Sequence, residues 1–289
     1  MSQNLFMKHF DQLVEQGLAV KKQSSDDFDF VLYKYHNRVF YDNLWHLSPL
    51  LSECRGIVFN TVTGQIVQRP FHKIFNVGEN GQETPENCER RMKVNGFMCA
   101  ATLLPEDTLF FSTTGSSNSE YVGMARTYID QLNWAGCNSE YTYLFEICDP
   151  RDPHIVQEQQ GAYLLSARHK QSGRYLLQTE CDQIAAVLGA KRPQQELDLK
   201  KEGWVYYDQY GTPIAKVKTA HYLSKKAFMR LGKRQAKIMF QDTEEFRKRL
   251  DEEFYEILDY LVNQYTESEY TDLSEQERRR VIEEYFNDI

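Results

Sequence analysis

The sequence contains no apolar run long enough to cross a membrane, and its first residues do not have the pattern of a signal peptide. None of its six cysteines forms a Cys-x-x-Cys pair or stands at zinc-binding spacing from a histidine. There is no internal repeat and no low-complexity linker. These absences disfavour membrane proteins, disulfide-stapled secreted domains and zinc-finger proteins. We therefore expect a soluble, cytoplasmic protein with no membrane partner.

The composition provides enough apolar material for a sizeable core. Of the 289 residues, 41% are hydrophobic and 13% are aromatic, while 26% are charged. This length suits one large domain with an appendage, or two domains.

Charge is distributed unevenly along the chain, whose formal net charge is −8. Residues 241–289 carry sixteen acidic and six basic side chains, so 28 of the 34 basic residues lie in the first 240 positions. Between Lys216 and Lys237 there are eight lysines and arginines and no acidic residue. This basic stripe predicts phosphate contacts, although a solvated helix face explains it equally well.

Hydrophobic periodicity predicts an α+β fold with an antiparallel-sheet core. Helices are expected from Leu5 to Val14, at 121–132 and at 181–188, and residues 77–89 are expected to form a loop. Alternating or β-branched runs predict strands at 28–35, 56–60, 65–68, 97–104, 109–112, 141–148, 163–167, 175–178, 204–207 and 214–218.

The last part of the chain predicts a C-terminal helical appendage. Apolar residues recur at steps of three and four from Phe246 to Tyr265. Asp242 and Ser274 each precede a glutamate by three residues, as in a capping box. We place a domain boundary near Tyr222, which gives domains at 1–222 and 223–289.

The segment Lys93-Val94-Asn95-Gly96 is informative because of the motifs on either side of it. Upstream are Glu53-Cys54-Arg55-Gly56 and the run from Arg69 to Asn76, which contains Lys73 and Phe75. Downstream are Glu146 within an apolar run, Glu202-Gly203-Trp204 and Lys216-Val217-Lys218. A lone lysine flanked in this order by an arginine, two isolated glutamates and a Lys-x-Lys pair predicts a site where a nucleotide is transferred to the lysine.

The chemistry of Lys93 depends on its neighbours. A lysine attacks phosphorus only as a free amine, and its ordinary pKa of about 10.4 leaves it protonated near neutral pH. Burial and neighbouring cations lower a lysine pKa, and the sequence offers Lys73, Lys216 and Lys218 as cations. Lys216 and Lys218 share one face of a predicted strand, where a triphosphate would relieve their repulsion. Taken alone, that pair is more often a solvent-facing strand.

The other candidates also have ordinary structural explanations. Glu146 is either buried with a partner, such as a ribose hydroxyl or a metal-bound water, or on the outward face of its strand. Glu202 either binds Mg²⁺ or is a turn residue. Gly96 either lets the backbone approach a ligand or belongs to an ordinary hairpin. Arg55 either binds phosphate or the ribose edge, or forms a surface ion pair.

Two further segments resemble ligand sites only superficially. Asp149, Asp152 and His154 have the composition of a metal site, but the prolines at 150 and 153 favour a rigid turn. Residues 112–116 are small and polar and could cradle a phosphate, but no Walker lysine follows them, so this is not a P-loop.

Taken in order, these motifs resemble the covalent nucleotidyltransferase superfamily of RNA ligases, DNA ligases and capping enzymes, and most closely the phage T4 RNA ligase 1 family. The resemblance covers roughly Tyr33 to Tyr222. It implies an ATP-grasp-like nucleotidyltransferase (adenylyltransferase) domain at 1–222. It also implies an ATP-dependent RNA ligase that seals 5′-phosphate and 3′-hydroxyl ends in RNA or tRNA repair, with broken RNA, tRNA included, as its partner.

The resemblance further implies a role for each site residue. Lys93 would attack ATP and keep AMP, AMP would pass to an RNA 5′-phosphate, and a 3′-hydroxyl would then displace it. Lys216 and Lys218 would act with Lys93 in catalysis by holding the transferred phosphate. Glu202 would bind the divalent metal, Mg²⁺ or Mn²⁺. The residues implied to bind the nucleotide are Arg55, Lys73, Phe75, Gly96, Glu146, Lys216 and Lys218.

Three positions depart from the family pattern. Asn95 stands where the phage family usually has aspartate, Thr114 where a lysine is common, and His154 where an arginine is expected. Two other functions stay open. One is nucleotidyl transfer to another acceptor, such as DNA ends, an RNA cap or a protein, and the other is a non-catalytic RNA-binding module.

Overall fold

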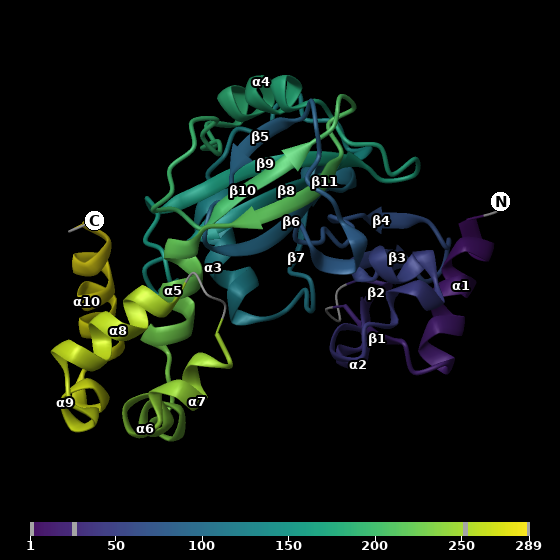
Figure 1. The fold of residues 1–289 in the computed structure, drawn as a ribbon. Helices are drawn as coiled ribbons and strands as arrows, with labels where there is room; N and C mark the ends of the chain where they lie inside the picture. The colour runs from purple at the N-terminus through teal and green to yellow at the C-terminus, as the bar shows by residue number, and fades with distance from the viewer. Residues whose placement is uncertain (1–2, 25–27, 251–253, 288–289) are drawn as a thin grey trace.

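The structure is a computed structural model that describes residues 3–24, 28–250 and 254–287. It has the predicted α+β architecture, with three antiparallel sheets and a set of C-terminal helices. Figure 1 shows two sheets in the centre, the N-terminal sheet on one side and the C-terminal helices on the other.

The N-terminal sheet has the strand order β1-β2-β3-β4 and is covered by the first helix. Phe10 and Leu13 of that helix are buried in one cluster with Tyr33 and Phe59 of the sheet. Two 3-10 turns, η1 (Leu44–Leu47) and η2 (Pro49–Ser52), precede β3. The regular elements are α1 (Gln3–Glu15), β1 (Ala19–Gln23), β2 (Phe30–Tyr35), α2 (Asn37–Tyr41), β3 (Arg55–Asn60) and β4 (Ile66–Gln68).

Two sheets make up the centre of the molecule. One has the order β11-β10-β5 and consists of β5 (Glu89–Met92), β10 (Gly203–Tyr207) and β11 (Pro213–Lys218). The other has the order β7-β6-β8-β9 and consists of β6 (Phe97–Leu103), β7 (Leu109–Ser112), β8 (Tyr141–Cys148) and β9 (Gly161–His169). Short 3-10 turns, η3 (Glu79–Gly81) and η4 (Pro105–Asp107), lie before β5 and between β6 and β7.

The side chains of β8 alternate between the two faces of its sheet. Tyr143, Phe145 and Ile147 pack in a cluster with α3 (Glu120–Ile129) and α4 (Gln178–Leu188). Because neighbouring side chains of a strand point to opposite faces, Glu146 points away from these helices. It is nevertheless only 8% exposed, so the alternative of a solvent-facing strand glutamate is excluded.

The C-terminal helices pack around their own apolar cluster, which includes Phe228, Met239, Leu258, Tyr270 and Ile282. Both predicted helix starts are confirmed: Asp242 accepts a bond from the Glu245 amide, and Ser274 and Glu277 bond reciprocally. The predicted boundary at 222/223 falls inside the first of these helices. They are α5 (Ala220–Met229), α6 (Lys233–Gln241), α7 (Thr243–Arg247), α8 (Tyr255–Gln264), α9 (Glu267–Asp272) and α10 (Glu275–Asn287).

The strand predicted at 175–178 is wrong. Tyr175 forms only an isolated bridge with Arg168, and α4 already begins at Gln178. Glu180 accepts a bond from the Leu177 amide at 2.7 Å, which caps the helix and turns the chain out of the extended conformation. Strands β1 and β5 are absent from the sequence prediction, because their charged sequences lack apolar alternation.

Two further expectations concern the cellular environment. All six cysteines are free thiols. No helix in the described ranges combines the length and the apolar character that spanning a bilayer requires. The cytoplasmic location stays a prediction.

A largely buried ion-pair network joins the N-terminal sheet to β9. The Glu53 carboxylate accepts bonds from Arg168 at 2.7 and 3.0 Å and from Arg69 at 3.1 Å. Burial alone would raise the pKa of Glu53, but Arg168 and Arg69 lower it to about 2. Glu53, part of the first motif, therefore has a structural role in holding the two sheets together.

We predict that Glu53→Gln lowers the free energy of unfolding by about 3 kcal/mol at pH 7, because it leaves two arginines without their carboxylate. The depressed pKa of Glu53 means that its contribution is complete above the ordinary carboxyl pKa and disappears as pH falls towards 2. Urea unfolding of both proteins between pH 7 and 3 should show the difference shrinking with acid. A difference independent of pH would contradict the ion-pair explanation.

Candidate active site

The segment that carries Lys93 crosses from one central sheet to the other. Lys93 directly follows β5, and its amide donates to the Gly203 carbonyl at 2.8 Å. Gly96 directly precedes β6. The crossing places the Lys93 side chain, which is 24% exposed, between the two sheets, with its Nζ 2.8 Å from Glu202 Oε2.

Glu202 lies at the centre of the site. Its carboxylate is buried, accepts bonds from Lys93 Nζ and, at 2.7 Å, from Asn95 Nδ2, and lies 3.6 Å from Lys218 Nζ. Burial raises the pKa of Glu202, but Lys93 and then Lys218 more than offset this and keep it lowered. A solvated turn residue would have no such partners, so that alternative explanation of Glu202 is excluded.

Glu146 approaches the same place from β8. Its Oε1 accepts a bond from the Gly96 amide at 3.1 Å. Burial raises its pKa to about 7, against the attraction of Lys93 and with the help of the charge on Glu202. Buried carboxylates such as Glu146 and Glu202 supply the oxygen ligands that a divalent cation such as Mg²⁺ prefers.

The structure shows one reason for glycine at position 96. A Cβ at this position would lie 2.2 Å from the Ile147 carbonyl oxygen, so glycine permits a close approach to the backbone of β8. This contact also brings the Gly96 amide to Glu146. The nucleotide contact that the resemblance implies for Gly96 stays a prediction.

The prediction that the pKa of Lys93 is lowered is wrong in this structure. Burial lowers this pKa, but the attraction of Glu202 and then of Glu146 outweighs it, so the pKa is raised. The reason is geometric: a carboxylate, rather than a cation, is the nearest charged group. Lys93 is held in place here as an ammonium ion.

Lys216 and Lys218 both have depressed pKa values. Burial, with Arg55, Lys93 and Lys73 nearby, lowers the pKa of Lys216 to about 7. Within the described part of the chain, the Nζ of Lys216 and the guanidinium of Arg55 have no carboxylate within ion-pair distance. Two half-buried cations without a carboxylate in direct contact favour an anionic ligand.

Lys73 lies in an aromatic enclosure on the N-terminal side of the site. Its Nζ is 4.8 Å from the ring centroid of Phe75, 5.2 Å from Trp45 and 5.3 Å from Phe40, and it forms an ion pair with Glu79 at 3.1 Å. The Phe75 carbonyl accepts a bond from the Lys216 amide at 3.1 Å, which joins this enclosure to β11. Phe40, Trp45 and Glu79 carried no sequence signal that could have identified them.

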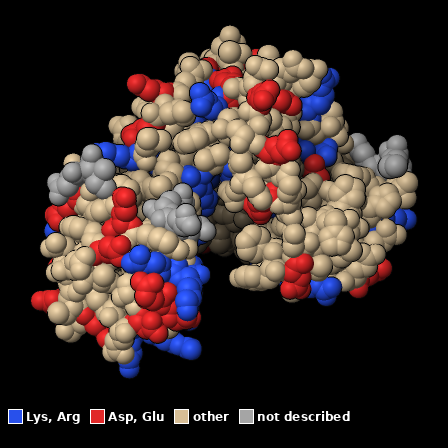
Figure 2. Space-filling model, in the orientation of Figure 1, with Lys and Arg blue, Asp and Glu red and all other residues tan. Residues whose placement is uncertain are grey.

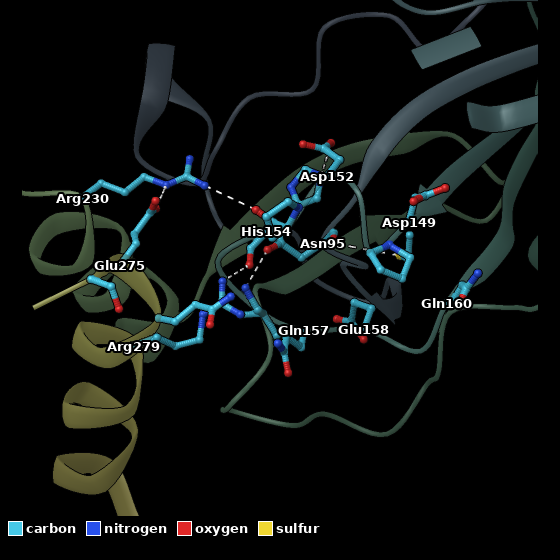
Figure 3. A pocket seen from close by; sticks show the side chains of 16 residues that line it. Asn95, Asp149, Asp152, His154, Gln157, Glu158, Gln160, Arg230, Glu275 and Arg279 are labelled. Atoms are coloured by element: carbon cyan, nitrogen blue, oxygen red, sulfur yellow. Dashed lines mark hydrogen bonds and ion pairs between the residues drawn. The ribbon is translucent and has the colours of Figure 1, made fainter. Parts of the chain in front are cut away.

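A pocket of about 600 Å³ opens beside Asn95, between residues 148–160 and the C-terminal helices (Figure 3). Asn95 Oδ1 accepts a bond from the Val156 amide at 2.8 Å. Arg279 donates to the His154 carbonyl at 2.6 Å, so α10 holds the His154 segment. This contact uses the backbone of His154, so it does not account for histidine at this position, one of the three departures.

The interpretation of residues 149–154 as a turn is supported. Asp149 pairs with Arg151, and Asp152 lies 2.9 Å from His154. Across the described residues, no group of three or more histidine, cysteine or acidic side chains is placed to hold a metal ion. The carboxylates of this segment are occupied by their own neighbours.

Residues 112–116 pack against β3, the strand that begins at Arg55. A Cβ on Gly56, whose φ is +94°, would lie 2.8 Å from the Thr113 carbonyl and 3.1 Å from Thr114 Cα. Thr113 Oγ1 accepts bonds from the amides of Gly115 and Ser116. The loop therefore uses these two amide donors internally, and Thr114 takes part in backbone packing on Gly56.

The comparison with known proteins agrees with this geometry. The family model described as RNA ligase matches residues 53–206. The chain belongs to the RNA ligase family. The RNA ligase 1 of bacteriophage TS2126 is 34% identical over 148 residues, which is 45% of this chain and 37% of the phage protein.

Solved structures show the same fold. An archaeal ATP-dependent RNA ligase superposes with a TM-score of 0.60 at 13% identity, over 91% of this chain and 79% of that one. The members of the RNA ligase family matched by sequence are longer: the chain spans 37–51% of the length of three curated relatives. The nucleotidyltransferase fold and family membership are therefore shown.

We predict that Asn95→Asp lowers the free energy of unfolding by about 2 kcal/mol, because it exchanges the donor facing Glu202 for a second carboxylate. This is expected even though aspartate is usual here in the resembling phage family. In the double variant with Glu202→Gln, the amide introduced at position 202 can donate to the carboxylate introduced at position 95. The double variant should therefore be more stable than Asn95→Asp alone. Chemical denaturation at pH 8 measures both, and equal stability of Asn95→Asp and wild type would refute the pairing.

Proposed function

We propose that this chain is an ATP-dependent RNA ligase that seals 5′-phosphate and 3′-hydroxyl ends through a lysyl-AMP intermediate in RNA or tRNA repair. The observation that supports this best is the 2.8 Å pair of Lys93 and Glu202, with the cations Lys216 and Arg55, unpaired among the described residues, close by. This arrangement combines a nucleophile with places for a metal and a triphosphate. A non-catalytic module would not need all of them together.

In the first step, the lone pair of the Lys93 amine forms a bond to the α-phosphorus of ATP, and the bond to pyrophosphate breaks. Lys93 must first lose a proton, which its pairing with Glu202 opposes. Glu202 would hold a divalent cation, which would supply positive charge for the phosphates. With Glu202 so engaged, repulsion from Lys216 and Lys218 would lower the pKa of Lys93.

In the later steps, AMP moves from Lys93 to the RNA 5′-phosphate, and the 3′-hydroxyl then attacks that phosphate and releases AMP. Each step crowds negative charge onto phosphate oxygens. Lys216, Lys218 and Arg55, whose charges act on one another, would neutralise that charge in all three steps.

We predict that the purified protein incubated with ATP and Mg²⁺ gains the mass of one AMP, and that Lys93→Ala does not. Lys93→Arg is the matched control, because it keeps a positive charge opposite Glu202 but its guanidinium stays protonated and cannot attack. Intact mass spectrometry before and after pyrophosphate treatment makes the measurement. AMP found on Lys93→Ala would refute the assignment of the nucleophile. Adding RNA ends or DNA ends to the protein that carries AMP identifies the acceptor.

We also propose that the C-terminal helices contribute phosphate contacts to RNA. Figure 2 shows a hollow between these helices and the N-terminal sheet, with lysine and arginine side chains on its helical side. Lys225 and Arg230 of the basic stripe are paired, with Glu283 and Glu275 respectively. The exposed members without an ion pair among the described residues are Lys226, Lys233, Arg234 and Lys237.

We predict that replacing Lys233, Arg234 and Lys237 by glutamine weakens RNA sealing and spares self-adenylation. The slope of log affinity against log salt should become shallower by about 0.7 for each phosphate that the variant no longer neutralises. A control variant removes the same charge at exposed residues elsewhere, namely Lys8, Arg90 and Arg174. Equal losses of RNA sealing in the two variants would mean that sealing depends only on the net charge of the protein.

A further inference from the structure

Two aromatic side chains of α2 are exposed beside the site. Tyr41 is 78% and Phe40 50% exposed, and their rings meet edge to face at 5.5 Å. Exposed aromatic pairs of this kind bury little apolar area within the chain, so they are available to a ligand. We propose that Tyr41 and Phe40 form a platform on which bases of the RNA strand stack outside the nucleotide site. This rests on the proposed function and names the substrate contact that the motifs leave unassigned.

The platform is continuous with the site. From Tyr41 the row passes to Phe40, whose ring centroid is 5.3 Å from Lys73 Nζ, and then to Phe75, whose ring centroid is 4.8 Å from the same Nζ. Phe75 is hydrogen-bonded through its backbone to Lys216. A strand whose end phosphate reaches Lys216 would place its bases along this row.

The position of α2 in the fold agrees with this path. Figure 1 places α2 on the edge of the N-terminal sheet that faces the C-terminal helices, and Figure 2 shows the hollow between them. The exposed aromatic rings belong to α2, and the exposed cations belong to the C-terminal helices across the hollow. Aromatic rings for bases and basic side chains for phosphates are the combination by which proteins bind single-stranded nucleic acid.

The local charge identifies the part of RNA that is bound here. Asp42 follows Tyr41 and is exposed, which disfavours a phosphate at this point. The contact is therefore between an aromatic face and a base. Stacking of one base on one aromatic side chain corresponds to about 5- to 150-fold in affinity.

Tyr41→Ala is the decisive variant, because this side chain is largely exposed and belongs to none of the motifs. We expect it to weaken binding of a short 5′-phosphorylated single-stranded RNA by at least about 5-fold. Tyr41→Phe should keep the wild-type affinity, since stacking uses the ring and not the hydroxyl. Tyr210→Ala is the matched control: Tyr210 is 64% exposed and lies between β10 and β11.

Three readouts separate the platform from other roles. Self-adenylation by Tyr41→Ala should equal that of the wild type, and the salt dependence of its RNA affinity should be unchanged, because the phosphates keep all their cationic partners. Sealing should fall in parallel with RNA affinity. Fluorescence anisotropy with labelled RNA at several salt concentrations, together with intact mass, measures all three.

The outcomes also separate this inference from the proposed function. Failure of the wild type to gain AMP would overturn the ligase proposal, while the anisotropy comparison would still decide the platform. Unchanged RNA affinity in Tyr41→Ala would overturn the platform alone. A change of oligomeric state in Tyr41→Ala at unchanged RNA affinity would assign the patch to protein contact and would likewise overturn it.

Discussion

The buried carboxylate of Glu202 is the constraint on which the rest of the site depends. A buried charge needs partners, and Glu202 obtains them from the Lys93 segment and from Lys218 of β11. Its own backbone carbonyl accepts a bond from the Thr219 amide, and Thr219 caps α5. One residue therefore contacts both Lys93 and the N-cap of the first C-terminal helix.

The fold brings distant motifs together through two features. The first is the crossing from β5 to β6, which holds Lys93 between the sheets and requires glycine at 96 because β8 leaves no room for a side chain. The second is the backbone pairing of residues 75–77 with Lys216 of β11, which brings the aromatic enclosure of Lys73 to the same site. Neither contact involves neighbours in the sequence, so both arise only when the sheets assemble.

The sequence was sufficient to predict most strands and the two helix caps, because alternation and capping are local properties. The gathering of the motifs at one site was predicted from their order and from the family resemblance. It could not decide the burial of Glu146, since the polar face of a strand has the same pattern whether it meets water or a second sheet. It also led to the wrong sign for the pKa shift of Lys93. Composition shows which charges are present, but only the arrangement shows that Glu202 is the nearest to Lys93.

The distribution of charge in the site favours an anionic ligand. Lys93 is neutralised by Glu202, and Lys73 by Glu79, while Lys216 and Arg55 have no carboxylate partner in the described part of the chain. Their mutual repulsion disfavours the site as it stands, and this cost is relieved only by an anion of high charge. The cations without a carboxylate partner would therefore favour the nucleoside triphosphate that we propose as the ligand, and the proposed reactivity of Lys93 would require Glu202 to be engaged elsewhere.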